Sequence, residues 1–314
     1  MSGRQSKVQI LLSTYNGEKF LAEQLDSLLQ QTYSKLLIAI RDDGSTDQTK
    51  NIIQEYTKKY PDKIKFYCEK NTGVIPSFFK LLSDYILEEA DYVCFCDQDD
   101  VWMPEKLERA IKSLERSSKD IPMMYVTSTQ MVTEALEPLN VWPPVPRRQP
   151  TFYNALIENI AVGATIMMNR SAVHKLQSHM PNLEKIVMHD WWTYLVISAF
   201  GNVIYDEVPS IYYRQHQSNV IGGQKGFIDK WVKKWSNYKK HRTQKILWNQ
   251  AKEFERCWGA ELPTEFQSAL GEFLLTNRGI VERARYAFST RLYRQSKLDS
   301  FVFRLMMIRG DILK

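Results

Sequence analysis

The first hundred residues alternate between two hydrophobic periods, and this alternation restricts the possible fold more than any other feature of the chain. Residues 8–12 and 36–40 are short apolar runs of the kind that forms buried strands. Between them, apolar side chains recur at helical spacing at Phe20, Leu21, Leu25, Leu28 and Leu29. The pattern predicts a strand, a helix and a second strand.

The same order continues along the chain. We expect a polar helix over 46–59, a strand over 64–67, a helix over 77–87 with Pro76 at its start, and an apolar strand over 92–96. Repeated βαβ units predict an α/β fold with a mainly parallel, doubly wound sheet that carries helices on both faces. Such sheets bind ligands outside the carboxyl ends of their strands, so site residues should directly follow the strands.

The second half of the chain is less regular. Five prolines between residues 138 and 150 exclude a regular helix and indicate a loop or a crossing between subdomains. Other elements are expected as helices over 104–115 and 189–200, an apolar stretch over 162–168, and strands over 203–205 and 211–214. From Phe227 onward the pattern is helical only.

Charge separates the two ends of the chain. We expect an α/β domain over residues 1–224 and a helical extension over residues 225–314. The net charge is +6, and the extension holds 19 Lys and Arg against 9 Asp and Glu, interleaved with aromatic residues. This end should meet an anionic partner such as a phospholipid surface, a lipid-linked pyrophosphate or nucleic acid. The more acidic first domain is suited to hold a cation.

Secretion and membrane insertion are not expected. The N-terminus leads directly into an apolar strand, without the apolar region and cleavage site of a signal peptide. No window approaches the roughly 18 consecutive apolar residues of a spanning helix. We therefore expect a cytoplasmic protein whose contact with the inner face of the plasma membrane is peripheral. The four cysteines are too scattered for a disulfide framework, and Cys94 and Cys96 should be packing residues.

Polar residues follow the first two predicted strands. The first strand ends in Thr14, Tyr15 and Asn16, which can hold a nucleoside base by stacking and hydrogen bonds, or can form an ordinary strand-to-helix turn. The second strand ends in Asp42 and Asp43. Burial of adjacent carboxylates is costly unless one of them accepts hydrogen bonds from a ligand, such as the N–H of a pyrimidine base.

Three carboxylates, those of Asp97, Asp99 and Asp100, follow the strand over 92–96. They repel one another unless a cation neutralises them, and an oxygen-rich site of this kind suits Mg²⁺ or Mn²⁺ shared with diphosphate oxygens. The alternative is a solvated acidic turn before the next helix, which explains Asp100 better than it explains Asp97 and Asp99. We expect the latter two to hold the metal.

The motifs on these strands, taken together, resemble the family 2 glycosyltransferases of the GT-A fold, over roughly residues 7–220. The motifs are Thr14-Tyr15-Asn16, Asp42-Asp43-Gly44-Ser45-Thr46-Asp47 and Asp97-x-Asp99. The segment over 96–102, Cys-Asp-Gln-Asp-Asp-Val-Trp, is similar to bacterial rhamnosyltransferases of cell-wall and capsular polysaccharide synthesis. The resemblance implies a nucleoside pocket lined by Thr14 and Tyr15, with Asn16 and Asp42 beside it and Asp43 on the base. It also implies a metal and diphosphate site at Asp97 and Asp99, with Asp99 as the direct ligand.

The resemblance also implies a general base at the start of a later helix, a position that Asp190 fits. Asp190 would deprotonate the acceptor hydroxyl as it attacks the anomeric carbon from the face opposite the departing diphosphate. The alternative for Asp190 is a helix N-cap, and His189 departs from the commoner Glu of the family. Trp191 and Trp192 fit either an acceptor-stacking platform or core positions.

Three further residues are expected near the donor. Gly163 lies in a segment similar to the loop that passes under the donor sugar in this family, although a plain buried strand explains it as well. Arg214 and His216, closely followed by Asn219, would reach the diphosphate and the metal as a flexible lid closes. The alternative for this pair is a solvated surface loop.

The resulting hypothesis is an inverting, metal-dependent glycosyltransferase that transfers L-rhamnose from dTDP-L-rhamnose to a glycan or lipid-linked acceptor. The donor rests on the resemblance alone, and a UDP-hexose is the alternative. A sugar-phosphate nucleotidyltransferase should carry a Gly-rich, basic loop after the first strand, where this chain has residues 13–17. A non-enzymatic binding protein would give no role to the carboxylates that follow the second and fourth predicted strands. We expect an anionic membrane surface as a partner of residues 225–314, no nucleic acid, and a possible homodimer.

Overall fold

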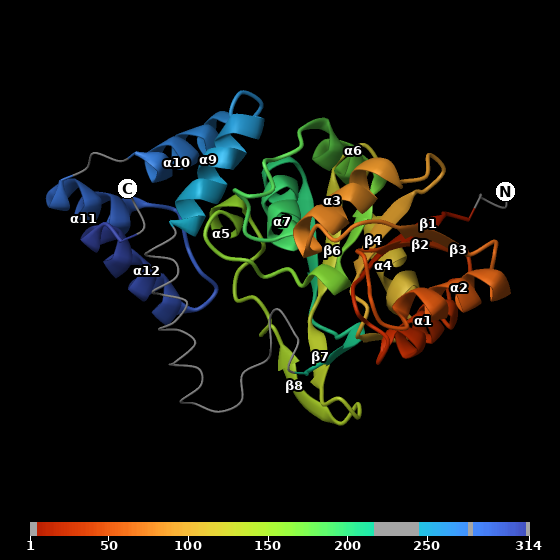
Figure 1. Cartoon of the computed structure of the whole chain (residues 1–314). Helices are drawn as coiled ribbons and strands as arrows, with labels where there is room; N and C mark the ends of the chain where they lie inside the picture. The colour runs from red at the N-terminus through yellow and green to blue at the C-terminus, as the bar shows by residue number, and fades with distance from the viewer. Residues whose placement is uncertain (1–4, 217–244, 276–278, 312–314) are drawn as a thin grey trace. The chain divides into compact units, whose positions relative to one another are not determined.

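The computed structural model describes residues 5–216, 245–275 and 279–311 (Figure 1). Its contacts divide the chain into two compact units. The first, here called the sheet unit, comprises Met1–Val145, Ala161–Ser178 and Gly201–Gly222. The second, the helical unit, comprises Pro146–Ile160, His179–Phe200 and Gly223–Lys314. Residues 146–160 and 179–200 therefore group with the C-terminal helices, while the proposed domain boundary at residue 224 stays a prediction.

The sheet unit is built on a seven-stranded sheet with the strand order β10-β6-β9-β4-β1-β2-β3. These strands are β1 Val8–Thr14, β2 Leu36–Asp42, β3 Ile64–Cys68, β4 Tyr92–Cys96, β6 Met123–Thr127, β9 Met167–Asn169 and β10 Asn202–Asp206. All neighbours pair in parallel except β9, which runs antiparallel to β4 and β6. The predicted α/β fold with a mainly parallel sheet is confirmed.

Helices cover both faces of this sheet (Figure 1). One face carries α1 Leu21–Leu29, α2 Thr49–Lys59 and α4 Lys106–Leu114, and the other carries α3 Val74–Asp84 and α6 Arg170–Ser178. Alternate strand residues point to opposite faces, so Val8, Ile10 and Leu12 pack in the core beneath α1, whereas Ser13 turns toward α3. The helix α1 buries Leu21, Leu25 and Leu28, the spacing from which it was predicted.

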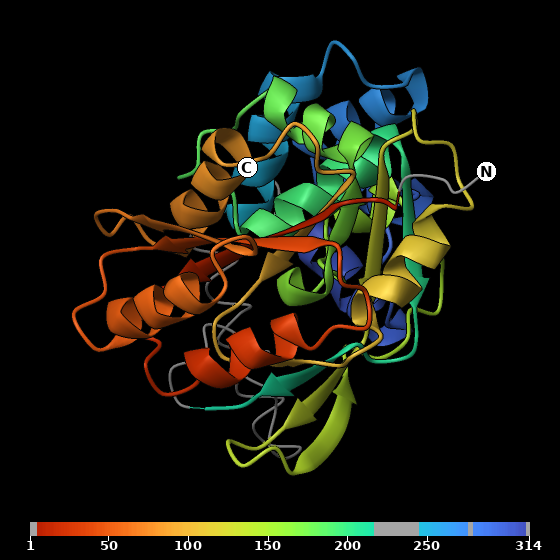
Figure 2. The same cartoon turned by 90° about the vertical axis from the view of Figure 1, so that its right-hand side faces the viewer.

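A second, four-stranded sheet has the order β5-β11-β7-β8 (Figure 2). Its strands are β5 Val101–Trp102, β7 Thr129–Val132, β8 Pro138–Trp142 and β11 Ile211–Arg214. The strand predicted over 211–214 is confirmed as β11, which pairs with β5 and β7 in this second sheet and not with the main one. The proline-rich segment also begins in a strand, β8, which lies at a sheet edge, where proline costs no ladder hydrogen bond.

Two other predicted elements are shifted. The helix expected over 77–87 begins at Val74, after Gly73 with φ 91°, so Pro76 lies within its first turn. Proline fits there because the first N–H groups of a helix lack intrahelical partners. The apolar stretch over 162–168 contains the 3₁₀ helix η1, Gly163–Thr165, and only its last residues enter β9.

The described residues of the helical unit form α5 Phe152–Ala155, α7 His189–Phe200, α9 Ile246–Trp258, α10 Thr264–Leu274, α11 Ile280–Ser289 and α12 Lys297–Arg309. Its core is aromatic, with the Phe254 ring packed against those of Phe152 and Trp192. Residues 217–244, including Phe227 and the predicted continuation of helix, lie outside the described residues. None of the helices that the structure describes is long and apolar enough to span a membrane.

Candidate functional site

The carboxyl ends of β1 and β2 place the first two motifs together. The strands are in parallel register with Thr14 opposite Asp42, and the Asp43 amide donates to the Thr14 carbonyl at 2.8 Å. The Tyr15 side chain is 48% exposed, so its ring is available to a ligand. Parallel pairing thus brings the predicted nucleoside-binding residues to one sheet edge.

Asn16 links the two turns that follow these strands. It adopts a left-handed conformation with φ 47°. Its side-chain oxygen accepts from the Thr46 amide at 2.8 Å, and its own amide donates to the Ser45 hydroxyl at 2.9 Å. These bonds give Asn16 a role in turn geometry, and its contact with a donor stays a prediction.

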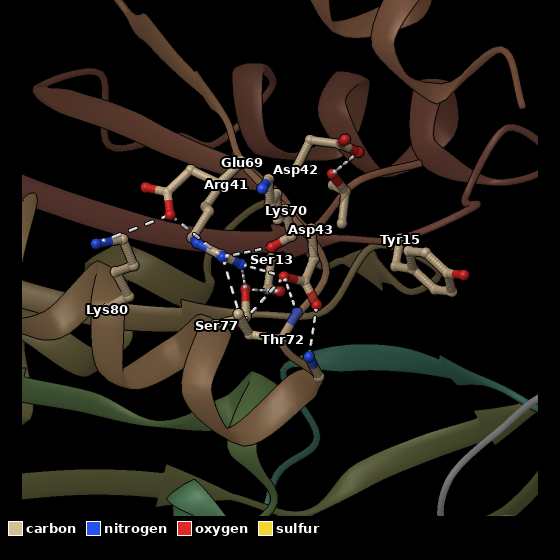
Figure 3. Close-up of polar contacts among 12 residues, drawn as sticks. Ser13, Tyr15, Arg41, Asp42, Asp43, Glu69, Lys70, Thr72, Ser77 and Lys80 are labelled. Atoms are coloured by element: carbon tan, nitrogen blue, oxygen red, sulfur yellow. Dashed lines mark hydrogen bonds and ion pairs between the residues drawn. The ribbon is translucent and has the colours of Figure 1, made fainter. Parts of the chain in front are cut away.

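Asp42 and Asp43 point to opposite sides of β2, as adjacent strand residues do (Figure 3). Asp42 is fully buried, and its carboxylate accepts from the Thr14 hydroxyl and from both the amide and the hydroxyl of Ser45. Asp43 accepts from Arg41 at 2.6 Å and from the amides of Thr72 and Gly73 at 2.9 and 2.8 Å. The Asp42 carboxylate therefore holds the turn together, and neither of its oxygens is exposed to a nucleotide-sugar donor in this structure.

The acidic segment after β4 has one enclosed member. Asp100 is fully buried, and burial, reinforced by Asp99 and then Asp97, raises the pKa of its carboxyl well above the usual value. One of its oxygens accepts from the Arg214 amide at 3.1 Å. The alternative of a solvated turn is therefore wrong for Asp100, which connects this segment to β11.

Asp99 lies at the junction between β4 and the second sheet. The His216 Nε2 atom is 2.8 Å from the Asp99 carboxylate, as expected for two residues that share a site. The Arg214 side chain is only 2% exposed, and its Nε donates to the Asp99 carbonyl at 3.0 Å. The Arg214 guanidinium also forms an ion pair with Glu23, and its Cζ atom lies 4.5 Å from the centre of the Phe20 ring. A solvated loop, the alternative for this pair, does not describe Arg214.

Glu23 and Phe20 are site-supporting residues that sequence reasoning missed. Both belong to the start of the α1 region, where an acidic first turn and an apolar residue are ordinary helix features. Only the long-range contact with Arg214 distinguishes them, and no local pattern signals it. Glu134 is a third partner, because its backbone carbonyl accepts from the Arg214 guanidinium.

The side chains at this edge of the sheet provide some of the ligand atoms that a divalent cation needs. Asp99 and His216 supply a carboxylate oxygen and an imidazole nitrogen, which suit Mn²⁺ better than Mg²⁺. Over the described ranges, no group of three or more His, Cys, Asp or Glu side chains has the arrangement to hold a metal by itself. A cation that also binds substrate phosphates needs only one or two protein ligands, so Asp99 and His216 could provide the protein's share of its ligands.

Gly163 belongs to the sheet unit, where it opens η1, a buried turn that packs against β4. Its predicted position under the donor sugar is not tested by these contacts. The position is also not a plain strand, the alternative considered for it.

Asp190, Trp191 and Trp192 belong to the helical unit, in the first turn of α7. Asp190 is 6% exposed, and its carboxylate accepts from the Trp191 amide at 2.6 Å. Burial lowers the pKa of the preceding His189 to about 3, so its imidazole is neutral at physiological pH. Within this turn, Asp190 is the acidic group.

The two tryptophans are core residues. Trp192 is fully buried, while Trp191 is 8% exposed and donates its indole N–H to the Ala155 carbonyl at 2.7 Å. Burial favours the core alternative for both rings. Trp192 offers no surface on which an acceptor sugar could stack.

Known proteins resemble this chain in sequence and in structure. The model of glycosyl transferase family 2 matches residues 9–177. A dTDP-rhamnosyl transferase of Shigella flexneri is 29% identical, covering 95% of this chain and 99% of that protein.

Two solved structures show the same fold at low identity. The Staphylococcus aureus protein TarS in complex with UDP-GlcNAc has a TM-score of 0.58 at 18% identity, covering 98% of this chain and 81% of that one. A Pyrobaculum calidifontis mannosyltransferase with GDP-Man and Mn²⁺ has a TM-score of 0.57 at 16% identity, covering 99% and 84%. The GT-A-like architecture is thereby confirmed. Because the family model spans more than half of the chain and includes the motifs after β1, β2 and β4, the chain belongs to glycosyl transferase family 2.

Proposed function

We propose that this protein is an inverting glycosyltransferase that transfers L-rhamnose from dTDP-L-rhamnose to a glycan or lipid-linked acceptor in bacterial surface polysaccharide synthesis. The observation that carries the proposal is the convergence of Tyr15, Asp43 and the Asp99–His216 pair on the carboxyl edge of one sheet. The near full-length similarity to a dTDP-rhamnosyl transferase supports the donor. Family membership leaves the nucleotidyltransferase and the non-enzymatic alternatives without support.

In this proposal Tyr15 stacks on the nucleoside, Thr14 completes the pocket wall, and Asp43 accepts the N–H of the pyrimidine base. Arg214 acts through its bonds to Asp99, which hold the acidic segment in place. Asp99, His216 and Asp97 would hold Mn²⁺ or Mg²⁺, which when bound supplies positive charge that stabilises the departing diphosphate. Gly163 lies under the donor sugar.

Asp190 is the proposed general base. Its carboxylate takes the proton of the acceptor hydroxyl, whose oxygen forms a bond to the anomeric carbon as the bond to the diphosphate oxygen breaks. Attack from the opposite face inverts the anomeric configuration, and dTDP leaves with the bonding electrons. The neutral His189 beside it places no positive charge next to this carboxylate.

A donor screen tests the function. Purified protein is incubated with dTDP-rhamnose, UDP-glucose, UDP-galactose or UDP-N-acetylglucosamine, each with Mn²⁺, Mg²⁺ or chelator, and release of nucleoside diphosphate is followed. We expect release from dTDP-rhamnose that chelator abolishes. Release from a UDP-sugar alone would contradict the rhamnosyl donor, and an absence of both turnover and dTDP or UDP binding by calorimetry would contradict the whole proposal.

Residues 225–314 are proposed to contact an anionic membrane through α12. Four apolar side chains of this helix recur on one face and are 41–57% exposed: Leu298, Phe301, Val302 and Leu305. The helix carries Lys297, Arg304 and Arg309 against the single acidic residue Asp299. An exposed apolar stripe with a cationic excess is typical of helices that lie on anionic lipid.

The membrane proposal predicts a lipid-dependent loss of binding. Replacement of Leu298, Phe301 and Leu305 by serine should lower binding to vesicles containing phosphatidylglycerol by at least about tenfold, since each apolar side chain contributes roughly 1.5 kcal/mol or more. The measurement is co-sedimentation, with phosphatidylcholine vesicles as reference. A matched control replaces three apolar residues of similar exposure in and after β8, namely Leu139, Val141 and Val145. If the α12 variant binds vesicles as the wild type does, or if it changes from a dimer to a monomer on gel filtration, the membrane proposal is contradicted.

A further inference from the structure

Arg41 is a fully buried cation of the sheet unit that the mechanism above does not use. It is the penultimate residue of β2, on the face covered by α3. Burying a guanidinium is costly unless its donors are paired. Its partners therefore indicate why a cation occupies this position.

The partners of Arg41 lie around its guanidinium, and Asp43 is one of them (Figure 3). One terminal nitrogen donates to the Asp43 carboxylate at 2.6 Å and to the Ser77 hydroxyl at 2.8 Å. The other lies 3.3–3.4 Å from Glu69, the Lys70 carbonyl and the Thr72 hydroxyl. Ser77 is held in turn by Ser13 at 2.6 Å, so β1, β2 and α3 all fix the position of the guanidinium.

The two oxygens of Asp43 are used unequally. Oδ1 accepts from Arg41, from the Thr72 amide and from the Thr72 hydroxyl at 3.2 Å. Among the described residues, Oδ2 accepts a hydrogen bond from the Gly73 amide alone, at 2.8 Å. Asp43 is only 2% exposed, but a carboxylate oxygen has about two acceptor sites, so one site on Oδ2 is not taken by these donors.

We propose that Arg41 is a positioning residue for nucleotide binding: it anchors Oδ1 of Asp43 and thereby presents Oδ2 to the N–H of the nucleotide base. This inference rests on the proposed function, in which Asp43 contacts the base. A carboxylate oxygen accepts and does not donate, so it selects bases with a ring N–H, such as thymine and uracil, over cytosine, whose corresponding nitrogen is an acceptor. Arg41 therefore contributes to the choice of base without touching it.

The test compares Arg41→Gln and Arg41→Lys with Asp43→Asn and with the double variant Arg41→Gln/Asp43→Asn. The dissociation constants for dTDP, UDP and CDP are measured by calorimetry. Lys80→Gln is the matched control, because Lys80 is a half-exposed cation 3.8 Å from Glu69 in the same network, and its ion pairs are with Glu69 and Asp84 rather than with Asp43.

We expect Arg41→Gln to weaken dTDP binding by about ten- to a hundredfold, the effect of losing a charge-assisted hydrogen bond. Arg41→Lys should weaken it less, because lysine retains the charge but not the planar fork that reaches both Asp43 and Ser77. The preference for dTDP over CDP should shrink in both variants. In the double variant the loss should not exceed that of Asp43→Asn alone, since Arg41 acts through Asp43.

A purely structural role gives a different result. It would lower the thermal midpoint while leaving the dissociation constants of the folded protein within about twofold of wild type. That outcome, additive losses in the double variant, or an equal loss in Lys80→Gln would overturn the inference. Failure of the wild-type protein to bind any nucleoside diphosphate would instead contradict the proposed function.

Discussion

Replacement of Asp190 by asparagine should lower kcat by roughly a hundred- to ten-thousandfold, the contribution expected of a general base. Asparagine retains the shape of the side chain and an oxygen that can accept from the Trp191 amide, so the first turn of α7 should persist. KM for the donor should change little, because Asp190 acts on the acceptor. The measurement is steady-state transfer at saturating donor, with dTDP binding checked by calorimetry.

A matched control separates the chemical role from a general effect of removing a negative charge. Glu184→Gln makes the same acid-to-amide change at an exposed position of the helical unit and should leave kcat unaltered. The low-pH limb of the kcat/KM profile should also disappear in Asp190→Asn, since that limb reports protonation of the base. A kcat within about threefold of wild type would assign Asp190 the structural role of a helix-start residue.

Replacement of Asp99 by alanine should reduce kcat/KM by roughly a hundred- to a thousandfold, as is typical when stabilisation of a developing negative charge is removed. The reduction is expected because Asp99 contacts His216 and is the proposed direct ligand of the metal. Residual turnover should no longer respond to chelator. His216→Ala should have a smaller effect, and the double variant should lose less than the product of the single losses, because both residues serve one site.

Glu134→Gln is the matched control for Asp99. Glu134 is an exposed acid that pairs with Lys19 and contributes only its backbone carbonyl to Arg214. Its substitution should leave turnover and chelator sensitivity intact. Full activity of Asp99→Ala in the presence of chelator would contradict a metal role for this carboxylate.

Local pattern sufficed for the elements of the first hundred residues, because the helical and strand periods and the turn residues between them are properties of short segments. It also located the predicted nucleotide-binding motifs, since parallel strands deliver the residues after their carboxyl ends to one edge. The same reasoning did not assign β11 to the second sheet, where its partners β5 and β7 lie far away in the sequence, and it took the proline-rich segment that contains the edge strand β8 for a loop. Strand partners are chosen by tertiary packing, which a short window does not contain.

The sequence by itself therefore determined the α/β class, the family and the set of polar residues at the strand ends. Only the tertiary structure decided how those residues are used. It buries Asp42 completely and leaves Asp43 only 2% exposed, and the hydrogen-bond donors to Asp43 come from β2 and from the segment between β3 and α3. It brings His216 to Asp99 across 117 residues, and it buries Trp192 among the aromatic rings of the helical unit. The physical reason is that burial and hydrogen bonding depend on neighbours in space, whereas periodicity depends on neighbours in sequence.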